Sequence, residues 1–138
     1  MNLVAIKYAR MMEVTFPEEY EQLKSKLPPL SETVQTLAAD ISRIHTDWAL
    51  EAHTRYPRLA AMGRPLNSDE ANGSRWAAID NYLHSELLTY SERTLRLCLR
   101  DTEKAKAEGV NLALRILENT ARLYGYPSLD AIEAALRR

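Results

Sequence analysis

Cysteine and glycine are both scarce in this sequence, which has one cysteine and four glycines among 138 residues. A single thiol, Cys98, excludes a disulfide framework within the chain and a zinc site built from several cysteines. This cysteine usage is typical of a reducing compartment, so a cytoplasmic location is expected. No apolar run approaches the roughly 18 residues that a membrane span requires, and the first residues do not form a signal peptide. The composition therefore predicts a soluble protein.

An excess of positive or negative charge is also missing. The 18 Lys and Arg residues nearly balance the 19 Asp and Glu residues, whereas a nucleic-acid binder usually carries a basic excess or stripe. DNA and RNA are therefore not expected as partners. The length fits one domain over residues 1–138 that can bury a core without metal or disulfides.

What the sequence does contain is helical periodicity. Strand-like alternation does not recur, and long stretches lack both Gly and Pro. The pattern predicts an all-α fold, an irregular bundle of six to seven helices, with an irregular connection at about 57–74 where Pro, Gly, Asn and Ser cluster. The helices are expected at about 2–14, 16–26, 32–56, 75–89, 92–108, 110–124 and 129–136.

Boundary signals support these ranges. Thr15, Ser31, Ser91 and Ser128 are expected as N-caps, and Gly109 and Gly125 as C-terminal stops. The longest helix carries an apolar stripe that should face the core, and helix 110–124 is apolar around most of its circumference, which is typical of a central bundle helix. The stripe consists of Val34, Leu37, Ile41, Ile44, Trp48 and Ala52.

Three residues are candidates for acid–base catalysis. Asp80 and His84 lie four apart on one predicted helix, so the carboxylate can orient the imidazole as in a general base. His45 lies within the apolar stripe and would approach this pair if the two helices packed face to face. The alternative is structural: a hydrogen-bonded helix pair for Asp80 and His84, and a satisfied core histidine for His45.

Ligand-binding candidates adjoin these residues. Trp48 is expected as an apolar wall beside His45, and Tyr56 as a contact at the end of the same helix. Glu86, Tyr90 and Arg93 flank the junction of two predicted helices, where they either bind a ligand or cap and pack a tight corner. No metal is expected, because Glu-x-x-His pairs are absent, and no cofactor motif is present.

Several stretches resemble an uncharacterised bacterial family that is labelled a domain of unknown function. The resemblance covers nearly the whole chain and implies a helical fold and a bacterial source, but it supplies no activity. It also implies an extra N-terminal segment with a cysteine and acidic residues, which this chain lacks, and Arg-Gly where this chain has His84-Ser85. The matching stretches are Asn2-Leu3, residues 7–13, Pro17-Glu18-Glu19-Tyr20, residues 56–60, Gly63-Arg64-Pro65, Tyr82-Leu83, residues 86–91, Glu118-Asn119-Thr120 and residues 123–126.

Three functions remain open from the sequence. The first is a small helical binding module for a partner protein or a small molecule. The second is a cofactor-independent enzyme that uses His45, Asp80 and His84 for proton transfer. The third is a structural subunit that forms a homo-oligomer, such as a dimer, through the exposed face of the first helix, and an apolar patch there would favour it.

Overall fold

The structure is a computed structural model and describes residues 2–61 and 79–137. Every regular element in this part of the chain is a helix, which confirms the all-α prediction. Seven α-helices have seven residues or more, as expected for a bundle of six to seven. The elements are α1 (Leu3–Thr15), α2 (Pro17–Leu23), the 3-10 turn η1 (Lys24–Lys26), α3 (Glu32–Arg55), α4 (Pro57–Ala61), α5 (Ile79–Leu87), α6 (Glu92–Ala107), α7 (Leu112–Leu123) and α8 (Leu129–Ala135).

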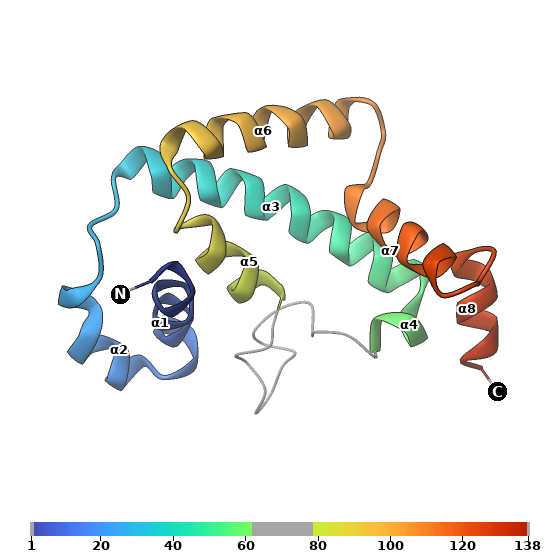
Figure 1. Cartoon of the computed structure of the whole chain (residues 1–138), viewed down its shortest axis with the longest axis horizontal. Helices are drawn as coiled ribbons and strands as arrows, with labels where there is room; N and C mark the ends of the chain where they lie inside the picture. Colours follow the sequence, from blue (N-terminus) through green and yellow to red (C-terminus); the bar gives the residue numbers. More distant parts are fainter. Residues whose placement is uncertain (1, 62–78, 138) are drawn as a thin grey trace.

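Helix α3 is the spine of the fold. Near its N-terminus it packs against α5, from Leu37 to Trp48 it lies along α6, and its C-terminal part packs against α4 and α7. Helices α1 and α2 pack on each other at one end of the molecule, with α1 against α5, and α8 closes the other end against α4 and α7. The bundle is irregular because no other helix accompanies α3 along its whole length as an equal partner (Figure 1).

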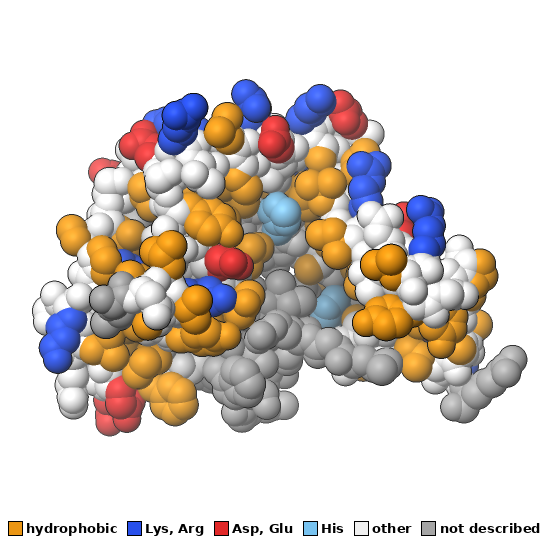
Figure 2. Space-filling view, viewed as in Figure 1, with side chains coloured by type: hydrophobic (Ala, Val, Ile, Leu, Met, Phe, Trp, Pro, Cys, Tyr) orange, Lys and Arg blue, Asp and Glu red, His pale blue; other side chains and the backbone are white. Residues whose placement is uncertain are grey.

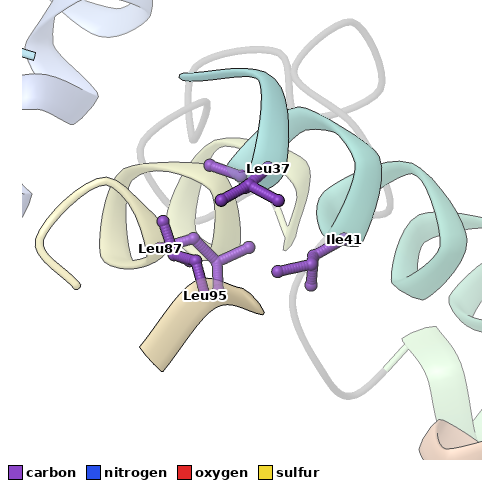
Figure 3. Close-up of a cluster of buried hydrophobic side chains, with 5 residues drawn as sticks. Leu37, Ile41, Leu87 and Leu95 are labelled. Carbon is purple, nitrogen blue, oxygen red and sulfur yellow. The ribbon is translucent and has the colours of Figure 1, made fainter. Parts of the chain in front are cut away.

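The predicted apolar stripe of α3 supplies the centre of the core. Leu37 and Ile41 converge with Leu87 from α5 and Leu95 from α6, as Figure 3 shows. Further along α3, Trp48 packs with the C-terminal part of α6, and Ala52 packs with α7 and α8. Different helices therefore bury successive parts of one continuous apolar stripe on α3.

Most predicted helix boundaries are confirmed. The side chains of Ser31, Ser91 and Ser128 each accept a hydrogen bond from a backbone N–H three residues ahead, as N-cap residues do. Gly109 and Gly125 adopt φ angles of 72° and 86°, the left-handed conformation that ends a helix and that glycine tolerates. Helix α5 is described from Ile79, and its expected start near residue 75 lies outside the described residues.

Two local predictions are wrong. Thr15 is the last residue of α1 rather than the cap of α2, because its hydroxyl donates to the Met11 carbonyl one turn back. The expected helix 16–26 also narrows to a 3-10 turn over its last three residues. Pro28 and Pro29 follow directly and cannot donate to a continuing helical ladder.

The apolar helix α7 is also placed differently from the prediction. It lies at one end of the bundle, not at its centre (Figure 1). Leu114 and Ala121 are its buried residues, whereas Ile116 and Leu123 are exposed. Because side chains on the far side of α7 meet solvent, this helix presents apolar surface.

The surface shows mixed charges. Basic and acidic side chains alternate over α6 along the upper edge in Figure 2. Among residues 2–61 and 79–137, no helix is both long and apolar enough to cross a membrane.

Candidate functional site

His84 of α5 lies beside α1. Burial lowers the pKa of His84 below its usual value, while the nearby carboxylates of Glu13 and Asp80 partly oppose this shift. The structure therefore places the predicted pair, Asp80 and His84, near a second carboxylate that comes from α1. An imidazole with a lowered pKa is neutral near pH 7 and is able to accept a proton.

A second polar contact joins α5 to α1. The Lys7 ammonium of α1 donates to the Tyr82 hydroxyl over 2.9 Å and lies 4.2 Å from the centre of the Tyr82 ring. This hydrogen bond, helped by the charge of Glu86, raises the pKa of Lys7. Partial burial and the Glu86 carboxylate raise the pKa of the Tyr90 hydroxyl. Glu86 and Tyr90, both predicted as ligand residues, are thus linked to each other and to α1.

His45 belongs to a different helix contact. Its Nε2 atom lies 3.3 Å from the Thr102 hydroxyl of α6, and its ring stands edge-on to Trp48 at 4.9 Å between centroids. Burial lowers the pKa of His45. Thr102 is also a side-chain partner of Cys98, and burial is the main cause of the raised pKa of the Cys98 thiol. The structure places His45 against Thr102 of α6, and its expected approach to Asp80 and His84 stays a prediction.

The remaining predicted residues lie elsewhere. Tyr56 is buried among Ala52, Leu114 and Leu129, far along α3 from its N-terminal half, and packs as a core residue. Arg93 lies on α6 over a shallow depression, and the described residues that line it all come from that helix. One helical face cannot surround a ligand, so this depression is a weak candidate for a binding site.

A more enclosed pocket of about 260 Å³ lies between α1, the segment before α3, and the corner that joins α5 to α6. Apolar side chains from three separate parts of the chain form most of it, and Tyr90 is the predicted ligand residue that lines it. Polar groups from the starts of α3 and α6 and one arginine of α1 complete the wall. The lining residues are Leu3, Ile6, Arg10, Pro28, Pro29, Leu30, Ser31, Val34, Leu88, Thr89, Tyr90, Ser91 and Glu92.

Arg10 is the pocket residue that sequence reasoning missed. Its side chain is 8% exposed, and its Nη2 group donates to the Pro28 carbonyl over 2.8 Å. A signal was present in the sequence, because Arg10 follows Leu3 and Ile6 at helical spacing along the inner side of α1. An arginine on such a stripe is unusual and marks a buried cation.

Metal chemistry finds no support in the part of the chain that the structure describes. No group of three or more His, Cys, Asp or Glu side chains there is arranged to hold a metal ion.

Comparison with protein families identifies the chain. Residues 1–134 match the family described as "Protein of unknown function (DUF4125)", and the chain belongs to this family. Comparisons with curated proteins and with solved structures find no match. The resemblance to a domain of unknown function is thereby confirmed, and the choice among functions depends on the geometry.

Proposed function

We propose that this protein is a small-molecule binding module whose site is the pocket between α1, the segment before α3 and the α5–α6 corner. The pocket carries this proposal because it is the place where three separate parts of the chain surround one mainly apolar space. Its volume of about 260 Å³ lies just below the range typical of small-molecule sites, so a small ligand is expected. Tyr90 and the neighbouring cap residues offer polar groups that would orient such a ligand.

Native mass spectrometry of untagged protein purified without added ligand tests this proposal. A co-purified molecule should add up to a few hundred daltons to the 15.7 kDa chain. Leu3 lines the pocket and Val4 does not, although both side chains are 61% exposed. We therefore expect Leu3→Trp to reduce the bound fraction several-fold and Val4→Trp to leave it unchanged.

Two other spectra would contradict the proposal. If both tryptophan variants retained the added mass equally, the ligand would lie outside the pocket. A dimer with no added mass would instead favour association through α1, which exposes several apolar side chains. These are Leu3, Val4, Tyr8 and Val14, followed by Phe16 directly after the helix.

A second candidate function, proton-transfer catalysis, is favoured by the surroundings of His84. A neutral imidazole beside two carboxylates is the arrangement of a general base with its orienting groups. The electrostatic influence of Glu13 and Asp80 on His84 is the observation that supports it. The contact that the structure shows for His45 is with Thr102 of α6, so this candidate is argued from His84 and Asp80.

The His84 hypothesis predicts a specific titration. Burial should hold the pKa of His84 below 6.5, and Glu13→Gln should lower it further, because this change removes a charge that favours the imidazolium. Since the folded state then binds the proton less readily than the unfolded chain, the stabilising contribution is complete above pH 6.5 and is lost as the pH falls through the folded pKa. NMR titration of the histidine ring protons, assigned with His84→Gln, measures this shift.

An exposed carboxylate on the other side of the molecule provides the control for this titration. Glu118→Gln on α7 should leave the pKa of His84 unchanged. An unchanged value in Glu13→Gln as well would show that α1 does not tune this histidine, and the catalytic candidate would lose its basis.

A further inference from the structure

We propose that the ligand of this pocket is a small carboxylate with an apolar body, and that Arg10 recognises its charge. This inference rests on the proposed binding function and adds the chemical class of the ligand. Three features of the pocket support it: a buried cation, two helix N-termini and an apolar lining.

The buried cation is incompletely satisfied by the protein. Arg10 donates from Nη2 to the Pro28 carbonyl, but its buried Nε–H has no hydrogen-bond partner within the described residues. The ion pairs formed by residues 2–61 and 79–137 do not include Arg10. A buried guanidinium without a counter-ion is costly, and an anion beside it would offset that cost.

Two helix N-termini open onto the same pocket. Ser31 and Ser91, the N-caps of α3 and α6, both line it. Each cap side chain satisfies one N–H, while the first amides of each helix keep no intrahelical partner. Both helices have at least 16 residues, and their dipoles add positive potential where their first turns meet the pocket.

One carboxylate also lines the pocket and opposes this potential. The Glu92 carboxylate is held by Arg96 of the same helix, with Oε1 at 2.7 Å from Nη2 and 3.1 Å from Nε. This pairing on the exposed side of α6 neutralises much of the Glu92 charge. The buried Arg10 and the two helix starts therefore determine the sign of the potential.

The lining selects the rest of the ligand. Leu3, Ile6, Val34 and Leu88 bring aliphatic surface, and Pro28 to Leu30 extend it. A multiply charged phosphate ester would leave most of its charge against this apolar wall, which is unfavourable. A single carboxylate with an aliphatic or aromatic body matches one cation and an apolar enclosure.

Binding of octanoate and octanamide, two probes of equal length and different charge, tests this inference. NMR titration of the labelled protein at low ionic strength should show octanoate binding at least about tenfold tighter than octanamide, since hydrogen bonds to charged groups are the stronger ones. The largest amide shifts should come from the first turns of α3 and α6. Arg10→Met should bind the two probes equally.

Arg10 also holds the segment before α3, so its replacement tests folding as well as binding, and Leu3 at the rim offers an independent series. At 61% exposure, a change at Leu3 leaves the core intact. Relative to Leu3→Gln, Leu3→Lys should tighten octanoate binding by about threefold and Leu3→Glu should weaken it by about threefold, as expected for a partly screened charge nearby. Octanamide affinity should be the same in all three variants.

The outcomes separate the two levels of the proposal. If octanamide binds as tightly as octanoate, or the Leu3 charge series has no effect, the carboxylate inference is wrong while small-molecule binding stands. If neither probe shifts the resonances of pocket residues, and no co-purified mass is found, both proposals fail.

Discussion

Leu95→Ala should destabilise the protein by about 2–5 kcal/mol, the range for removing a buried leucine side chain without collapse of the site. Leu95 is 0% exposed and packs where α3, α5 and α6 meet. Its neighbours come from three helices (Figure 3), so no single side chain can move to fill the space without disturbing the others. Urea denaturation followed by circular dichroism measures the loss in the free energy of unfolding.

The matched control lies two residues along the same helix. Leu97 is 43% exposed, and Leu97→Ala should change the free energy of unfolding by no more than about 0.5 kcal/mol. Equal losses in the two variants would mean that α6 does not direct Leu95 into the core, and the packing described for α3, α5 and α6 would be wrong.

Asn111→Ala should cost about 2–4 kcal/mol, because this side chain performs two separate tasks. Its Oδ1 atom accepts from the Leu114 N–H and caps α7, while its Nδ2 group donates to the Trp48 carbonyl and to the Glu51 carboxylate of α3. Loss of a cap costs about 1 kcal/mol, and each lost hydrogen bond to α3 contributes about 0.5–1.5 kcal/mol. The same denaturation measurement gives the total.

Asn111→Ser separates the two tasks. Serine caps a helix about as well as asparagine, but its shorter side chain cannot reach Trp48. The serine variant should therefore lose the bonds to α3 and keep the cap, so its stability should lie between those of the wild type and Asn111→Ala. If the serine and alanine variants were equally unstable, the cap would contribute nothing. Asn119→Ala, on the exposed side of α7, is the control and should have little effect.

The sequence predicted the fold to the extent that its signals were local. The stripe of α3 and the caps Ser31, Ser91 and Ser128 depend on residues within one or two turns, and they were read correctly. The central position predicted for α7 was wrong. An apolar circumference suggests that a helix is buried, but it does not show which other helices cover it. The prediction that Thr15 caps α2 was wrong because its hydroxyl donates instead to the Met11 carbonyl, one turn back in α1.

The site depended on distant contacts and was predicted only in part. Tyr90, predicted as a ligand residue from its place at a helix corner, lines the pocket, whereas Glu86 is not among its lining residues. A ligand-binding role for either residue stays a prediction. The spacing of Asp80 and His84 revealed that pair but not Glu13, which approaches from α1. Helical spacing placed His45 on the inward stripe of α3 but could not show its contact with Thr102 of α6.

The bond between α8 and α4 has a consequence for the order in which the chain folds during synthesis. The buried Glu133 carboxylate accepts from the backbone N–H groups of Arg58 and Leu59, over 2.9 and 3.0 Å, and so caps the first turn of α4. These partners are separated by 75 and 74 residues along the chain. The ribosome must therefore complete α8 before α4 acquires its cap, whereas α1, α2 and η1 can pack on one another as soon as they emerge. Nascent chains should accordingly protect the N-terminal helices early and residues 57–61 only after α8 has emerged.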